Sequence, residues 1–405
     1  MDTSEDRDAQ ERLASYITDI GNLLGNPSQR AAFAMYAYGL FGPAARKTME
    51  AIAAQACPDE ARTGAAHQRI QHFISNADWS DSELRLAASR HVLAEMTRHS
   101  EIETWIVDDT GFEKQGKHSV GVQRQYTGSA GKITNCQIGT SLTLATANFH
   151  VPVDFELYIP ETWTDDANRR KRAKIPPEVK FQTKPQQALT MIRRALEGEL
   201  PKGTVLADEA YGDSAAFRMG LRIHGLHYGV AVSKTTKVHP VDKNGKVSEE
   251  AFSVSKLINR DRRRYQFHRY TWREGTNRAL SARFAFRRIV PANERHRGQH
   301  EHLWLITEWR DGEPRPAHFY LVTEQNLSRK EMARQVKERW RTERVYQDFK
   351  NQLGLDHFEG RSYGGWHHHV TVGLVCYAFL VAELARCFPP SAEWTPHHGP
   401  LRLAA

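Results

Sequence analysis

Acidic side chains at three places in this 405-residue chain could together bind divalent metal ions. Asp108 and Asp109 follow the apolar segment Trp-Ile-Val, Asp208 follows Val-Leu-Ala, and Glu343 lies within a long helical pattern. Carboxylates that come from two strands and a helix are the hard oxygen ligands that Mg²⁺ prefers. Two such ions can activate a nucleophile and stabilise the leaving oxygen when a phosphodiester is cut. The pattern therefore predicts metal-dependent phosphoryl transfer.

Glu343 has a cation on either side along its helix. We expect one helix from Ser328 to Leu353, on which Arg339, Glu343 and Lys350 share a face at about 100° per residue. Arg–Glu pairs four residues apart are common on solvated helices and contribute only a few tenths of a kcal/mol. The stripe alone therefore has an ordinary structural explanation, and it is the two strand-end aspartates that favour a phosphate-binding site.

Composition indicates a globular, multidomain protein with a polyanionic partner. A chain of 405 residues exceeds what one hydrophobic core usually serves, so we expect two or three domains. Lys and Arg number 56 against 48 for Asp and Glu, a formal charge of +8, which favours nucleic acid although many soluble proteins are mildly basic.

Features of location and redox chemistry point to the cytoplasm. The four cysteines have no Cys-x-x-Cys pairing, so neither a disulfide framework nor a Cys-rich zinc module is expected. The N-terminus is acidic and does not resemble a signal peptide. The apolar run Val370–Ala382 is too short to span a bilayer and predicts a core helix. No Walker A sequence is present, so ATP is not an expected ligand.

The first hundred residues have a helical pattern. Apolar side chains recur at three- and four-residue intervals between Leu13 and Leu24, and Asn26-Pro27-Ser28 offers a fresh helix cap. We expect an all-α domain over residues 1–100. Its basic side chains, among them Arg62 and Arg69, could contact DNA phosphates or simply solvate the surface.

From residue 103 the apolar period changes to two, which indicates strands. A helix, a strand, a second helix and another strand then follow between residues 184 and 233, whereas the charged segment Asp165–Pro177 is expected to be a loop. This order predicts an α/β sheet with Asp208 at its carboxyl edge, where ligands usually bind. The expected strands are Glu103–Asp109, Ser119–Tyr126, Asn135–Asn148, Val151–Ile159, Thr204–Asp208 and Tyr228–Ser233.

Residues 235–315 form a basic, strand-rich segment that we interpret as an insertion. Its aromatic side chains, Trp272 and Trp304 included, alternate with arginines. Such a surface can hold phosphates and stack unpaired bases, but alternating aromatics are also typical of any half-buried sheet. The core is expected to resume over 316–388, with a frayed tail at 389–405.

Four blocks of sequence, taken in order, resemble the DDE transposases of the RNase H-like superfamily, and within them the IS701 group related to IS4. The IS4-type signature Tyr-x2-Arg-x3-Glu-x6-Lys maps onto Val336, Arg339, Glu343 and Lys350, so that Val336 stands where the signature has Tyr. The blocks are Asp108–Val122, Leu206–Gly212, the helix of Glu343, and Gly354–Arg361.

The resemblance implies a fold and a reaction. The fold would be α/β, with an RNase H-like mixed sheet flanked by helices, formed by 101–234 and 316–388. A β-rich insertion would separate the second Asp from the Glu helix. Asp109, Asp208 and Glu343 would be catalytic and would bind two Mg²⁺ or Mn²⁺ ions. The enzyme would cut DNA at insertion-sequence ends and join it elsewhere.

The partners implied are double-stranded DNA, both terminal inverted repeats and target, and a second copy of the chain on paired ends. Neither a membrane nor ATP is implied. The residues expected to contact DNA are Arg339, Lys350, Lys234, Lys237, Lys114, Lys117, Trp272 and Trp304.

Several alternatives stay open at this point. Asp108 competes with Asp109, because adjacent strand residues point to opposite faces and only one of them can reach the metals. A stand-alone nuclease of the same fold would cut but not join. A regulator derived from a transposase would bind DNA without cutting, and an unrelated basic α/β protein would have its carboxylates far apart.

Overall fold

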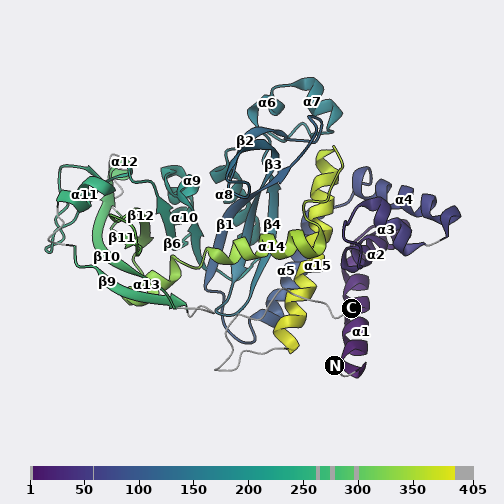
Figure 1. The fold of residues 1–405 in the computed structure, drawn as a ribbon, viewed down its shortest axis with the longest axis horizontal. Helices are drawn as coiled ribbons and strands as arrows, with labels where there is room; N and C mark the ends of the chain where they lie inside the picture. The colour runs from purple at the N-terminus through teal and green to yellow at the C-terminus, as the bar shows by residue number, and fades with distance from the viewer. Residues whose placement is uncertain (1–2, 58, 261–264, 274–278, 296–300, 388–405) are drawn as a thin grey trace. The chain divides into compact units, whose positions relative to one another are not determined.

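The computed structural model describes residues 3–57, 59–260, 265–273, 279–295 and 301–387. The expected frayed tail, 389–405, lies outside them. The chain divides into two compact units (Figure 1). Unit 1 comprises Met1–Ile102, Asp109–Leu200 and Thr342–Ala405, and unit 2 comprises Glu103–Asp108 and Pro201–Arg341. The boundary passes through one strand, β1 (Thr104–Glu113).

Helices in unit 1 surround one long apolar helix, α15 (Tyr363–Cys387). Helices α2, α4 and α5 each pack against α15, and most of its side chains are buried. Although α15 is long and apolar enough to cross a membrane, its burial identifies it as the core of this helical layer. The helices that precede β1 are α1 (Thr3–Gly21), α2 (Pro27–Phe41), α3 (Met49–Ala56), α4 (Glu60–Ser75) and α5 (Asp81–Met96).

Three consecutive histidines on α15 connect it to the N-terminal helices. Because successive helix residues diverge by about 100°, each ring meets different neighbours. His367 lies between the carboxylates of Asp81 on α5 and Glu156 on strand β4 (His150–Leu157). His368 stacks on Trp79 with ring centroids 3.9 Å apart, and His369 is hydrogen-bonded through Nδ1 to the Tyr36 hydroxyl at 2.8 Å. Their role is to pack the helices together.

Burial of His369 predicts a pH-dependent stability. Burial lowers the pKa of His369 to about 4, whereas an exposed histidine titrates near 6.5. The unfolded chain therefore binds the extra proton first as the pH falls. This contribution to stability is complete above about pH 6.5 and decreases toward pH 4 by up to about 3 kcal/mol. Urea midpoints measured from pH 4.5 to 7.5 should depend less on pH in His369→Gln, while His72→Gln, at an exposed site, should match the unmodified protein.

The sheet of unit 1 is antiparallel. Strand β3 (Lys132–Ala145) pairs with β2 (Gln123–Thr127) on one side and with β4 (His150–Leu157) along its later residues. Helix α14 (Trp340–Leu353) lies across these strands (Figure 1), and its Phe349 and Tyr346 rings meet Phe155 of β4. The remaining helices are α6 (Glu161–Thr164), α7 (Ala167–Arg172) and α8 (Lys184–Glu197).

The expected loop at Asp165–Pro177 contains helix α7, so that prediction was wrong. Asp166 caps the helix by accepting hydrogen bonds from the backbone N–H groups of Asn168 and Arg169. An Asp cap satisfies N–H groups that a helix start leaves unpaired, which explains why this basic run becomes helical.

Unit 2 contains a large mixed sheet flanked by helices. Strand β5 pairs in parallel with both β1 and β6, and the sheet continues through the antiparallel strands β12, β11, β10, β7 and β8, while β9 pairs with β10. The segment 235–315 thus contributes strands to this sheet. The strands are β5 (Thr204–Ala207), β6 (Tyr228–Val232), β7 (Lys237–Pro240), β8 (Phe252–Ser253), β9 (His268–Arg273), β10 (Leu280–Pro291), β11 (Leu303–Trp309) and β12 (His318–Thr323). The helices are α9 (Glu209–Gly212), α10 (Ala215–Ile223), α11 (Val254–Arg260), α12 (Ala292–Arg295) and α13 (Arg329–Gln335).

The single helix expected from Ser328 to Leu353 is interrupted. Ser328 begins α13 with a capping box, as its sequence indicates, but α13 ends at Gln335 and α14 begins at Trp340. The reason is tertiary, because the intervening turn directs Lys337 to the fully buried carboxylate of Glu308 on β11.

Candidate active site

Two of the predicted carboxylates lie just beyond the parallel pairing of strands β1 and β5 in unit 2. Strands β1 and β5 pair with Ile106 opposite Leu206, and Asp108 and Asp208 each lie two residues beyond that pair. Asp208 keeps an extended backbone and caps α9 by accepting a hydrogen bond from the Ala210 N–H at 2.9 Å. The fold thus delivers two carboxylates to the same sheet edge.

Asp108 and Asp109 point to opposite faces of β1. Asp109 accepts a hydrogen bond from Lys184, at the start of α8. The two side chains form an ion pair, with Lys184 Nζ 2.9 Å from Asp109 Oδ2. Thr110, on the other face, accepts a hydrogen bond from Lys350 of α14, also at 2.9 Å. Because strand side chains alternate, Asp108 points to the same face of β1 as Thr110. The position of Lys184 was not predicted, since only the helix start at this point is visible in the sequence.

Helix α14 presents Glu343 on the side that carries Lys350. The two residues are seven apart, which is two helical turns. The helix is fixed on β3 through hydrogen bonds from Tyr346 to Ser141 at 2.6 Å and from Thr342 to Thr143 at 3.2 Å. Glu343 itself is exposed, and within the described chain its carboxylate makes no side-chain hydrogen bond or ion pair. It is available for a ligand.

Arg339 lies in the turn before α14 and binds Asp108, with Nη2 2.9 Å from Oδ2. The same turn is anchored by Lys337, whose ammonium lies 2.8 Å from the Glu308 carboxylate. Burial acts to raise the pKa of Glu308, but the Lys337 charge and hydrogen bonds from Lys337, Tyr320 and Arg310 bring that pKa below its ordinary value. A charged buried pair therefore holds the turn that carries Arg339.

The other predicted DNA-binding lysines fall into two groups. Lys117, Lys234 and Lys237 are exposed. Lys114 is partly buried and donates to the Phe358 carbonyl at 2.7 Å, and burial lowers its pKa. Lys114 therefore has a structural role in joining β1 to the segment before α15, whereas the three exposed lysines can meet a polyanion.

Trp272 and Trp304 are partly buried in unit 2. Both pack against a cluster that includes Phe284 and Ile306. Lys337 Nζ lies 4.8 Å from the centre of the Trp272 ring, and the Arg288 guanidinium lies 5.4 Å from that of Trp304. These contacts support packing of the half-buried sheet as the role of both rings.

The chemistry of these side chains fits a hard divalent cation, because Asp108, Asp208 and Glu343 all offer carboxylate oxygens. Within the described residues no three His, Cys, Asp or Glu side chains already form a metal-binding group. Asp108 and Asp208 belong to unit 2, whereas Asp109 and Glu343 belong to unit 1.

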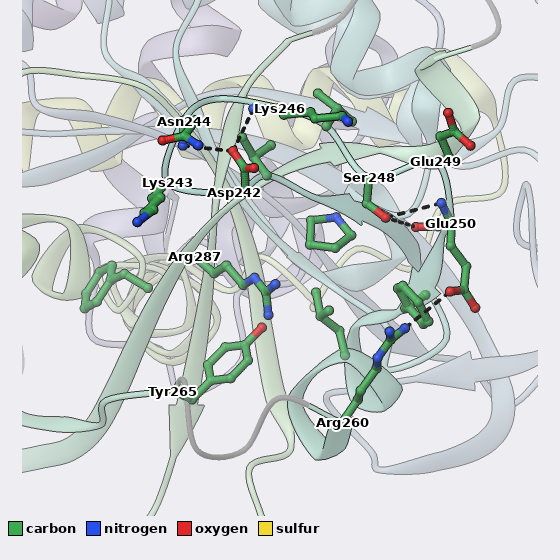
Figure 2. A pocket seen from close by; sticks show the side chains of 16 residues that line it. Asp242, Lys243, Asn244, Lys246, Ser248, Glu249, Glu250, Arg260, Tyr265 and Arg287 are labelled. Atoms are coloured by element: carbon green, nitrogen blue, oxygen red, sulfur yellow. Dashed lines mark hydrogen bonds and ion pairs between the residues drawn. The ribbon is translucent and has the colours of Figure 1, made fainter.

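A pocket of about 1040 Å³ elsewhere in unit 2 includes none of these residues (Figure 2). Its polar lining mixes both charges, since Arg260 pairs with Glu250 and the Asp242 side chain accepts hydrogen bonds from the backbone of its own turn. Such a lining shows no preference for a polyanion, so we do not assign the pocket to the active site.

Comparisons with known proteins identify the family of the chain. A family described as DDE superfamily endonuclease matches residues 19–279, and one described as transposase DDE domain matches residues 181–379. A probable transposase for insertion sequence element IS701 from Microchaete diplosiphon is 28% identical over 202 residues. That alignment covers 50% of this chain and 48% of the relative, so the chain spans about half the length of the protein it matches.

Proposed function

Because the chain belongs to the DDE superfamily endonucleases, we propose that it is a DNA transposase that cuts and joins strands at insertion-sequence ends through a divalent metal centre. The observation that carries this proposal is the pair of carboxylates, Asp108 within β1 and Asp208 directly after β5, just beyond the parallel pairing of these two strands. The match to an IS701 transposase supports the substrate class. We infer an RNase H-like core for the mixed sheet that holds these strands.

We propose Asp108, Asp208 and Glu343 as the metal ligands. The resemblance assigns the first position to Asp109, but the alternation of β1 favours Asp108, which shares the face of Thr110 and therefore of α14. Asp109 then has a separate task as the partner of Lys184, which fixes α8 against β1. The expected ions are two Mg²⁺, or two Mn²⁺ in their place.

Bound metal ions would lower the pKa of a water or 3′-hydroxyl nucleophile and stabilise the leaving oxygen. The protein's own groups orient the DNA. Arg339 and Lys350, on either side of Glu343, would bind the phosphates that flank the scissile one, and Arg339 would move from Asp108 to a phosphate when metal takes that carboxylate. Exposed Lys117, Lys234 and Lys237 would extend this contact with the DNA backbone.

The proposed partners are duplex DNA, as terminal repeats and as target, and a second copy of the chain on paired ends. The net charge of +8 favours binding to duplex DNA. We propose that the protein acts on DNA in the cytoplasm, with α15 as a buried core helix.

The purified protein should cleave duplexes that carry the element's ends and join pre-cleaved ends to target DNA in Mg²⁺, and neither product should form in EDTA. Cleavage without joining would identify a nuclease of the same family. Binding without either reaction would identify a regulator that has lost catalysis. Absence of DNA binding at low salt would overturn the proposal.

A further inference from the structure

The two-stranded ribbon β2–β3 of unit 1 has an unusually apolar exposed end. Tyr126 of β2 lies directly opposite Ile133 of β3, and these side chains are 62% and 60% exposed. Arg124 and Lys132 are both exposed; Arg124 is two residues from Tyr126 and shares its face of the ribbon, whereas Lys132 is next to Ile133 and points to the opposite face. In the described part of the chain neither cation has an ion pair or a side-chain hydrogen bond. We call these four residues the ribbon surface.

The ribbon contacts β1, the strand that carries Asp108 and Asp109. Thr127, which ends β2, is buried beside Gly111, where a Cβ atom would lie 2.2 Å from the Thr127 hydroxyl oxygen. Ser129 in the turn donates to Thr127 or accepts from it at 2.9 Å, and its hydroxyl lies 3.4 Å from the Gly111 carbonyl oxygen. Gly111 is three residues after Asp108, so the end of β2 lies beside the part of β1 that follows this carboxylate.

A second cationic element adjoins the base of the ribbon. The Trp163 indole of α6 donates to the Val122 carbonyl at 2.9 Å, just before β2 begins, and Arg169 of α7 lies 4.9 Å from the centre of the Trp163 ring. Helix α7 also carries Lys171 and Arg172, which are exposed and have no ion pair among the described residues. Figure 1 shows α6 and α7 beside β2.

From these contacts we propose that the ribbon surface is a second binding surface for duplex DNA, in which β2–β3 enters a groove beside the cleaved strand. The proposal rests on the proposed function and names an additional part of its substrate contact. A two-stranded ribbon fits the major groove of B-DNA. Arg124 and Lys132 would bind phosphates at the groove edges, while the Tyr126 ring and the Ile133 side chain would contact sugars and bases.

Charge favours DNA over a second copy of the chain. A two-fold contact places each surface against itself, so Arg124 and Lys132 would meet the same cations of the other copy with no acidic residue of the ribbon surface to offset them. An apolar pair with Arg124 on its own face and Lys132 on the opposite face of the ribbon is instead complementary to the apolar sugar faces and polyanionic edges of a duplex groove.

The test measures binding of the full chain to a labelled end duplex in EDTA, so that no strand is cut. The double variant Arg124→Ala/Lys132→Ala should lower the slope of log K against log salt by about two, close to 0.9 for each lost phosphate contact. Tyr126→Ala and Ile133→Ser should each weaken binding by about tenfold with little change in slope, as expected for loss of stacking and apolar contact.

Two matched controls are available. Ile223→Ser removes an equally apolar side chain that is 75% exposed in unit 2, and Arg193→Ala removes an exposed arginine of unit 1. Both should bind as the unmodified protein does. If the unmodified protein binds but the ribbon variants match it in affinity and slope, the ribbon assignment fails while the proposed function stands. If Tyr126→Ala instead dissociates a dimer without altering DNA binding, the surface joins two copies and the DNA assignment is overturned.

Discussion

Asp208→Asn should abolish metal-dependent strand cleavage while the protein still folds and binds DNA. Loss of one carboxylate ligand removes several kcal/mol of transition-state stabilisation, so we expect at least about a 1,000-fold decrease in single-turnover rate. Asn is as good a helix cap as Asp, so the hydrogen bond that the Asp208 side chain accepts from Ala210 can survive. Cleavage of end DNA in Mg²⁺ is the measurement, and retained activity would remove Asp208 from the site.

The same assay separates Asp108 from Asp109. If Asp108 is the ligand, Asp108→Asn should match the loss seen in Asp208→Asn. Asp109→Asn should retain a measurable rate and lose stability, because Lys184 loses its ionised partner. Lys184→Gln is the matched control, and it should resemble Asp109→Asn in both rate and urea midpoint. The opposite ranking of the two aspartates would restore Asp109 as the ligand.

Sequence patterns predicted the elements that depend on local chemistry. The strands around Asp108 and Asp208 have apolar runs that end in an acidic residue, and α10 begins at its cap Ser214 and ends before His224 as its pattern indicates. Helix α7 was missed, although the Asp166 cap was a local signal for it. Caps and periodicity act over a few residues, so one stretch of chain contains what is needed to recognise them.

Features that depend on distant partners could not be predicted in this way. The break between α13 and α14 exists because Lys337 turns toward Glu308, 29 positions earlier in the chain. The choice between Asp108 and Asp109 depends on which face of β1 meets α14, and that follows from the contact between Lys350 and Thr110. Packing between strands and helices decides both features. The periodicity of a single helix or strand does not contain this information.

Removing the Glu308 carboxylate should have the largest effect on stability. Glu308 is fully buried, accepts hydrogen bonds from both Lys337 and Tyr320, and lies beneath the turn that carries Arg339. In Glu308→Ala the mostly buried Lys337 ammonium would lose its counter-charge, which typically costs about 3–5 kcal/mol. Unfolding in urea can be followed by tryptophan fluorescence, to which Trp272 contributes with its ring 4.8 Å from that ammonium, and the urea midpoint should fall accordingly.

The double variant Glu308→Gln/Lys337→Met distinguishes the cost of an unpaired charge from the value of the pair. It removes both charges while keeping similar volumes, so its stability should lie within about 1–2 kcal/mol of the unmodified protein. If the pair also positions Arg339, the double variant should fold yet cleave end DNA more slowly, with a reduced salt slope for DNA binding. Recovery of stability together with full cleavage would show that the pair acts on folding alone, and equal destabilisation of the single and double variants would show that packing around Glu308 is what stabilises the turn.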